Sequence, residues 1–151
     1  MKRKIVCFFA ILFSCLALSS CALFGREDDG ATVQNAKVLA KSEHLVVIQV
    51  LECQEGASVF DAMKFLKEKG ELEFVSESST YGESLLSLNG KENPADWSYY
   101  WQFYVSDESQ GNPDSTYVFE DTTCYFAQKG ISGIKAKQGG IYLWEFAKST
   151  W

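Results

Sequence analysis

Apolar and polar residues follow a strand period over most of the chain and a helical period in one segment. The run LVVIQVLEC, residues 45–53, is rich in β-branched residues and predicts a strand. The segment EGASVFDAMKFLKEKG, residues 55–70, predicts a helix, because Ser58 is a suitable N-cap, Asp61 completes a capping box, and Gly70 follows the last periodic position. The apolar side chains of this helix share one face, which we expect in the core: Val59, Ala62, Met63 and Leu66, with Phe60 beside them.

Short strands are expected after Gly70, over residues 72–76, 84–88, 97–105 and 140–147, with a turn at Asn89-Gly90. An insertion between Asp107 and Cys124 predicts an extra hairpin around Glu120-Asp121. One helix followed by a run of strands predicts an α+β fold, with one main helix packed on an antiparallel or mixed sheet and an extra hairpin insertion.

The strand WSYYWQFYV, residues 97–105, is unusually aromatic. Alternation places one set of its side chains in the core: Trp97, Tyr99, Trp101, Phe103 and Val105. On the other face Tyr100 and Tyr104 flank Gln102, so two rings lie beside an amide that both donates and accepts hydrogen bonds. Such a face suits a planar ligand with polar edges. The alternative is that these three residues lie under the extra hairpin or face water.

The N-terminus has the order of a secretory signal. Three basic residues precede a fourteen-residue apolar run, which is shorter than the ~20 residues of a spanning helix. The following LSSC, residues 18–21, resembles a bacterial lipobox, so residues 1–20 are predicted to be a lipoprotein signal peptide and Cys21 the lipidated residue. This predicts an extracytoplasmic protein anchored to the bacterial membrane; an ordinary signal peptide with a chance cysteine is the alternative.

The predicted mature chain divides into a tether and one domain. Residues 21–43 are polar, include two glycines and show no sustained period, which predicts a flexible tether before a domain over residues 44–151. The chain carries a net charge of −6, and loss of residues 1–20 removes three bases and no acids, which leaves about −9. A surface this acidic disfavours nucleic acid as a partner.

The composition also disfavours metal binding and catalysis. Cys53 and Cys124 are the two cysteines left beyond Cys21. In an oxidising compartment a disulfide between them is the favoured interpretation, and two buried free thiols are the alternative. His44 is the sole histidine, and no metal-ligand spacing, Ser-His pair or phosphate loop is present, so we expect neither a metal site nor an enzyme.

Four segments occur in an order that resembles the transcobalamin-like C-terminal domain over about residues 45–147: EGASVFDAMKFL, YGESLLSLNG, YYWQFYV and AQKGISGIKAKQGGIYLWEF. The resemblance implies a small β-grasp-like domain and cobalamin or another corrinoid as the ligand. It also implies that Tyr100, Trp101 and Gln102 lie in the ligand-facing segment, although alternation puts Trp101 in the core and makes it the weaker candidate.

This chain departs from the family pattern in ways that bear on ligand binding. Gly139-Gly140 and Ser106-Asp107 replace the Gly-Asp and Asn-Gly that family members often carry. The chain also lacks the large helical domain that completes the site in the animal carriers.

The aromatic face and the family resemblance together predict a non-catalytic module that holds a corrinoid or another flat molecule and hands it to a membrane transporter. The alternative is a structural or interaction module that binds a surface protein or a glycan.

Overall fold

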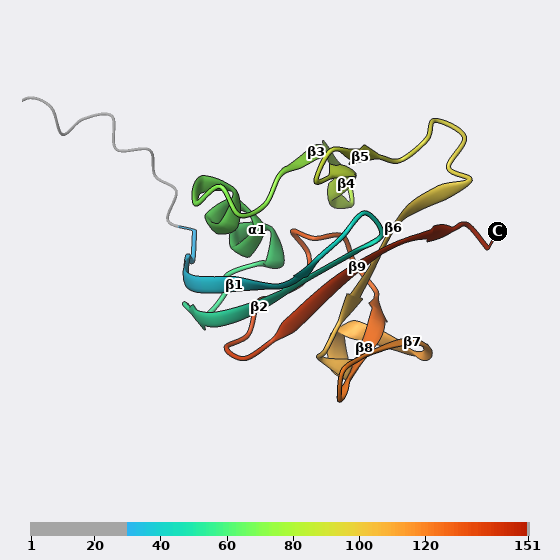
Figure 1. Cartoon of the computed structure of the whole chain (residues 1–151). Coiled ribbons are helices and arrows are strands. Elements are labelled where there is room, and N and C mark those ends of the chain that lie inside the picture. The colour runs from blue at the N-terminus through green and yellow to red at the C-terminus, as the bar shows by residue number, and fades with distance from the viewer. Residues whose placement is uncertain (1–29, 151) are drawn as a thin grey trace, which may run out of the picture.

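The computed structural model describes residues 30–150, and these residues fold mostly as β-strands (Figure 1). Strands take 54% of them and helices 11%. The elements are β1 (Val33–Lys41), β2 (Leu45–Cys53), α1 (Val59–Glu68), β3 (Phe74–Ser79), β4 (Gly82–Leu88), β5 (Lys91–Glu92), β6 (Tyr99–Val105), the 3-10 helix η1 (Glu108–Gln110), β7 (Gly111–Phe119), β8 (Thr122–Ala127) and β9 (Ile141–Lys148).

The α+β prediction, with a β-grasp-like domain built around one main helix, is wrong. The described residues form a β-protein in which α1 is a ten-residue element beside nine strands. Two strand-forming regions account for the difference. The predicted tether contributes β1, and the insertion contributes β7 and β8, which are integral members of the main sheet.

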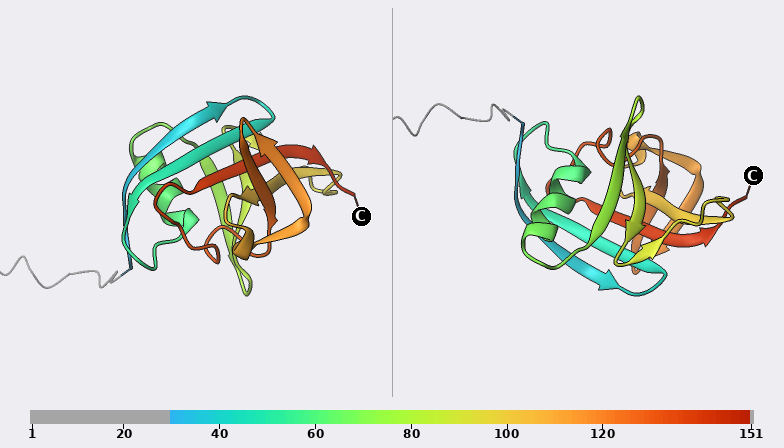
Figure 2. Two further views of the ribbon diagram at one scale, coloured as in Figure 1. Left: turned by 90° about the horizontal axis from the view of Figure 1, so that it is seen from below. Right: turned by 90° about the horizontal axis from the view of Figure 1, so that it is seen from above.

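The strands form two antiparallel sheets. The larger sheet has six strands in the order β1-β2-β9-β6-β8-β7, and the smaller has three in the order β3-β4-β5. Helix α1 and the smaller sheet lie on one side of the larger sheet, and the β7–β8 hairpin curls toward the other side (Figures 1 and 2).

Strand β1 corrects the predicted tether, which was expected to reach residue 43. Its backbone pairs with β2 from Val33 opposite Cys53 to Lys41 opposite Val46, with three register shifts. These bulges change which residues face the core, so Val33 and Ala36 are buried although they are three residues apart. The signal peptide over residues 1–20 and Cys21 lie outside the described residues. Within residues 30–150, no helix has the length and apolarity needed to cross a membrane.

The helix prediction is confirmed. Ser58 Oγ accepts from the Asp61 backbone N–H (3.2 Å), and Asp61 Oδ2 accepts from the Ser58 N–H (2.8 Å), which completes the capping box. Burial acts to raise the pKa of Asp61, but hydrogen bonds from Lys64 and Ser58 outweigh it and hold that pKa below its usual value. The buried face of the helix is the predicted one: Val59, Ala62, Met63 and Leu66.

The larger sheet is covered on both faces, and this explains why β2 is apolar on both sides. Val46, Ile48 and Val50 pack toward α1, whereas Val47 packs on the opposite face. We call the two groups the helix-side core and the hairpin-side core. The helix-side core contains the buried face of α1 with Trp101, Phe103, Val105, Tyr142 and Trp144, and the hairpin-side core contains Val47, Tyr104, Cys124 and Leu143.

Candidate functional site

Strand β6 follows the predicted alternation only from Trp101 onward. Trp101, Phe103 and Val105 are buried in the helix-side core, as expected. Trp97 and Tyr99 were expected there too, but they are 48% and 45% exposed. Trp97 has a φ of +54°, which takes it out of the strand conformation, so β6 begins two residues later than predicted.

Tyr104 and Gln102 lie on the opposite face of β6, where Tyr104 is buried and Gln102 is partly buried. The Tyr104 ring is 6% exposed and packs at 5.8 Å from Tyr117 and 5.5 Å from Phe126, centroid to centroid. Its hydroxyl donates to Gln102 Oε1 (2.9 Å), and Gln102 Nε2 donates to the Lys148 carbonyl (3.2 Å). Burial raises the pKa of Tyr104, and the nearby Glu145 adds to this effect. The hairpin covers this part of the face, which is the alternative that the sequence left open.

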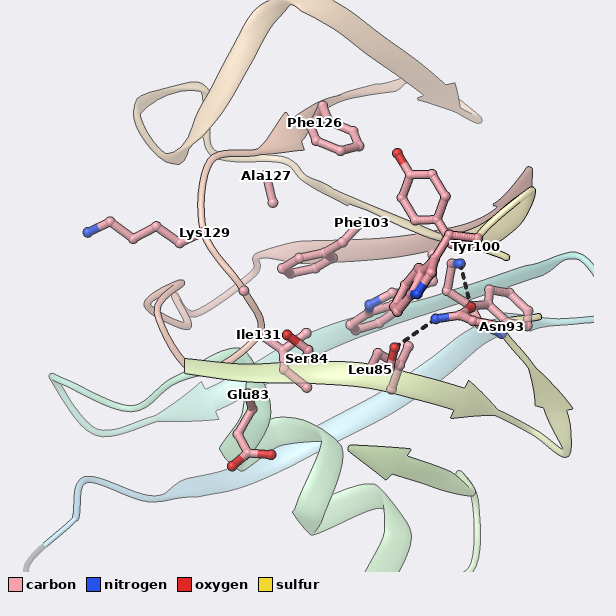
Figure 3. A pocket seen from close by; sticks show the side chains of 14 residues that line it. Glu83, Ser84, Leu85, Asn93, Tyr100, Phe103, Phe126, Ala127, Lys129 and Ile131 are labelled. Atoms are coloured by element: carbon pink, nitrogen blue, oxygen red, sulfur yellow. Dashed lines mark hydrogen bonds between the residues drawn. The ribbon is translucent and has the colours of Figure 1, made fainter. Parts of the chain in front are cut away.

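Tyr100 and Trp101 lie elsewhere, at a pocket between the two sheets (Figure 3). Its volume is about 200 Å³. Tyr100 is partly buried at its rim, and this burial raises the pKa of the phenol. Strand β4 contributes Glu83, Ser84 and Leu85, β6 contributes Tyr100, Trp101 and Phe103, β8 contributes Phe126 and Ala127, β9 contributes Trp144, and loops contribute Asn93, Trp97, Lys129, Gly130 and Ile131.

The two sides of the pocket are joined by Asn93. Asn93 Oδ1 accepts from the Trp101 backbone N–H (3.1 Å), and Asn93 Nδ2 donates to the Leu85 carbonyl (2.8 Å), as Figure 3 shows. The Trp101 indole N–H donates to the Lys91 carbonyl at 2.9 Å. These bonds link β6 to the smaller sheet and fix the orientation of the Trp101 ring, so the pocket is formed before any ligand arrives.

Trp144 completes the lining from β9. Its side chain is fully buried, and its ring stacks on Phe103 at a centroid distance of 4.9 Å and an interplanar angle of 7°. Its Nε1–H finds no acceptor within residues 30–150. The alternation of β9 predicted that one set of its residues is buried, but no sequence signal marks an indole N–H that lacks an acceptor.

The lining is mostly aromatic and aliphatic, with two charged residues. In Figure 3 the Glu83 carboxylate and the Lys129 ammonium both extend away from the cluster of rings. Across the described part of the chain, no group of three or more His, Cys, Asp or Glu side chains is placed to hold a metal ion. The aromatic side chains of the lining offer stacking surfaces, and its polar side chains offer hydrogen bonds.

The favoured Cys53–Cys124 disulfide is absent from the structure, in which both residues are free thiols, the alternative that the sequence left open. Cys53 packs against the helix-side core, with Sγ 3.7 Å from the Ala136 carbonyl oxygen. Cys124 is buried in the hairpin-side core, where desolvation raises its pKa to about 11. The six-stranded sheet separates the two cores, so Cys53 and Cys124 lie on opposite sides of it.

Comparison with known proteins gave no relatives. No family model, no curated protein and no solved structure matches this chain. The resemblance to the transcobalamin-like C-terminal domain therefore stays a prediction.

Proposed function

We propose that this protein is an extracytoplasmic lipoprotein, anchored to the membrane at Cys21, whose domain binds a small flat ligand in the pocket between β4 and β6 without changing it chemically. The observation that carries the proposal is the lining of the pocket. Tyr100, Trp101, Phe103 and Trp144 surround one hollow that is preformed by the Asn93 hydrogen bonds. Aromatic faces favour flat ligands, because stacking adds to the burial of apolar area.

The predicted ligand residues have two different roles in this proposal. Tyr100 and Trp101 contact the ligand. Gln102 and Tyr104 act as positioning residues, since the Tyr104 ring packs against Phe126 of the hairpin and its hydroxyl is fixed by the hydrogen bond to Gln102 on the same strand.

A corrinoid is the candidate ligand that the family resemblance implies, and its size sets a condition on how it binds. The pocket of about 200 Å³ is below the ~300–1,000 Å³ of typical small-molecule sites. A corrinoid, with its macrocycle and side chains, therefore enters with one part only and needs a second protein, such as a transporter, to enclose the rest.

The second candidate function is an interaction module for a surface protein or glycan. It is favoured by Trp97 and Tyr99, two large side chains that are about half exposed. Trp97 lines both the proposed ligand pocket and a neighbouring hollow with Val75 and Pro94. Exposed aromatic side chains are enriched at protein interfaces.

The test is a titration of the full-length protein with cobalamin and cobinamide, followed by Trp and Tyr fluorescence corrected for ligand absorbance. The blocking variant is Ser84→Phe, which puts a ring at the pocket wall. Its matched control is Ser78→Phe, at an exposed position of the same β3–β4 hairpin that does not line the pocket. We expect saturable binding tighter than about 10 μM, or about 7 kcal/mol, in the native protein and the Ser78 variant but not in the Ser84 variant.

Two results would count against this proposal. Equal binding by both variants would place the ligand outside the pocket. Absence of binding by either corrinoid, with all three proteins folded, would remove corrinoids as ligands.

A further inference from the structure

We infer that the outer face of the smaller sheet carries a second binding site, which takes a quaternary ammonium group. The site is the hollow lined by Trp97 and Glu92, and we call it the Trp97 hollow. It is separate from the pocket between β4 and β6, although Asn93 and Trp97 line both. The inference therefore goes beyond the proposed function.

The floor of the Trp97 hollow is a row of side chains across the smaller sheet. Val75 of β3 pairs with Ser87 of β4, and Ser87 pairs with Glu92 of β5, so all three point to the same face. Phe74 and Leu88, which neighbour this row in sequence, are buried in the helix-side core, so the row faces outward. The volume of the hollow is about 330 Å³, within the ~300–1,000 Å³ of typical small-molecule sites.

A hydrogen-bonded loop between β5 and β6 presents Trp97 as a wall of the hollow (Figure 1). The Trp97 N–H donates to the Pro94 carbonyl (2.9 Å), and Asp96 Oδ1 accepts from the Ser98 N–H (3.0 Å). Trp97 has a φ of +54°, which is strained for a bulky residue, and such strained residues cluster at functional sites. The residue is 48% exposed, and no ring-stacking or cation–π contact among residues 30–150 involves it. Its indole face is therefore accessible to a ligand.

The charge of the lining favours a cation. Glu92 is the one charged residue that lines the hollow, and its carboxylate forms no ion pair within residues 30–150. The chain as a whole carries a net charge of −6. A cation in the hollow is attracted both by the Glu92 carboxylate and by the negative face of the Trp97 indole.

The scarcity of free acceptors favours a quaternary ammonium over a primary one. Both ends of the Asn93 amide are engaged, by the Trp101 N–H and the Leu85 carbonyl, and the Pro94 carbonyl accepts from Trp97. Most of the remaining lining is apolar, with Val75, Leu86 and Ala95. A primary ammonium brings three donors that need acceptors. A quaternary ammonium has no N–H, and its methyl groups pack against apolar side chains.

The test compares three probes at neutral pH. Choline carries a quaternary ammonium, 3,3-dimethylbutan-1-ol has the same shape with carbon in place of the charged nitrogen, and ethanolamine carries a primary ammonium. The full-length protein is labelled with ¹⁵N at the tryptophan indoles, and the Nε1–H resonance of Trp97 is followed during each titration. The Trp97→Gly variant assigns this resonance and keeps the backbone conformation, because glycine adopts a positive φ without strain.

We expect choline to bind the native protein about ten-fold more tightly than either of the other probes. Glu92→Gln should weaken choline binding about three-fold and leave 3,3-dimethylbutan-1-ol unaffected. The matched control is Glu77→Gln, which removes the same charge from an exposed position of β3 outside the hollow and should bind choline as the native protein does. Trp97→Gly should bind none of the probes; if it does not fold, the native protein and the two Gln variants decide the question.

Vesicles distinguish two sources of the ammonium group. Sedimentation of the native protein with phosphatidylcholine vesicles, but not with phosphatidylglycerol vesicles, and its loss in Trp97→Gly would assign the group to a lipid headgroup. Equal sedimentation of both proteins with both vesicles, together with choline binding, would assign it to a free molecule.

The outcomes separate this inference from the proposed function. Equal affinities for choline and 3,3-dimethylbutan-1-ol would overturn the preference for a cation, and equal affinities for choline and ethanolamine would overturn the quaternary class. A Trp97 resonance that stays in place at tens of millimolar choline would overturn the site itself. Ser84→Phe should still bind choline, because Ser84 does not line the Trp97 hollow, so the corrinoid and choline titrations fail independently.

Discussion

Tyr104 gives the clearest distinction between a ligand contact and a structural residue. The Tyr104→Ala substitution removes a ring that is 6% exposed and packs against Tyr117 and Phe126. Truncation of a buried aromatic side chain costs about 3–5 kcal/mol of unfolding free energy. The Tyr104→Phe substitution keeps the ring and removes the 2.9 Å hydrogen bond to Gln102, which contributes about 1 kcal/mol.

Urea unfolding followed by far-UV circular dichroism measures both free energies by linear extrapolation. The control is Tyr81→Ala, because Tyr81 is 91% exposed at the β3–β4 turn and its loss should change the free energy by less than about 0.5 kcal/mol. We expect the order Tyr104→Ala, Tyr104→Phe, Tyr81→Ala from the least to the most stable variant. We also expect Tyr104→Phe to retain most of the cobalamin binding, because its ring still packs against Tyr117 and Phe126 of the hairpin.

Two results would refute this reasoning. If Tyr104→Ala loses no more stability than Tyr81→Ala, the ring does not hold the hairpin against the sheet. If Tyr104→Phe keeps full stability and no longer binds cobalamin, Tyr104 is a ligand contact, as the strand alternation alone predicted.

Three further predictions concern titratable groups. Burial raises the pKa of Tyr142 to about 12, above the value of about 10 in an unfolded chain. The stability that the neutral phenol contributes should therefore be complete below pH ~10 and decline as the pH rises toward 12. Tyrosinate absorbance and circular dichroism, recorded together over this pH range, measure the ionisation and the unfolding. The Lys137 ammonium, 2.5 Å from Asp107, lowers the pKa of that carboxyl from 3.8 to about 2. The ion pair should contribute about 1 kcal/mol to the free energy of unfolding, a small value because Lys137 is more than half exposed. This contribution should be complete above pH ~4 and be lost as the pH falls toward 2. Acid unfolding of the Asp107→Asn variant should not show this loss. A thiol reagent at neutral pH should label Cys53 in the folded protein and Cys124 only after unfolding, because Cys124 is buried and its pKa of about 11 leaves little thiolate. Peptide mapping that finds neither residue labelled in denaturant would contradict the two free thiols.

Local signals predicted local structure well, and long-range packing explains what they missed. The Ser58 capping box and the turn at Glu120-Asp121 depend on neighbours in the sequence, and both are present in the structure. Strand β1 was missed because its bulges break the period of two. Alternation placed Tyr104 and Gln102 on the correct face of β6. It could not show that the hairpin lies over Tyr104, since that contact depends on how the β7–β8 hairpin pairs with β6 and curls against it.

The residues of the candidate site also divide into those marked by local sequence signals and those placed by long-range packing. Tyr100 and Trp101, which the sequence singled out in the aromatic segment, line the pocket, and their role in binding stays a prediction. Asn93 and Ser84 come from the smaller sheet and its connection, and their approach to β6 depends on how the two sheets pack. The unpaired N–H of Trp144 depends on every neighbour of one atom, which a linear pattern does not contain.

If Cys21 carries the proposed lipid, the early start of β1 limits the distance between the membrane and the domain. With the proposed lipid on Cys21, twelve residue steps separate the anchor from Val33, so the connection spans at most about 40 Å, roughly half of what a tether to residue 43 would allow. The first residues of β1 lie at one end of the domain and the C-terminus at the other (Figure 1). A connection of this length would keep the end of the domain at which β1 begins near the lipid. The opposite end of the domain, where Tyr99 pairs with Lys148, would then face away from the membrane.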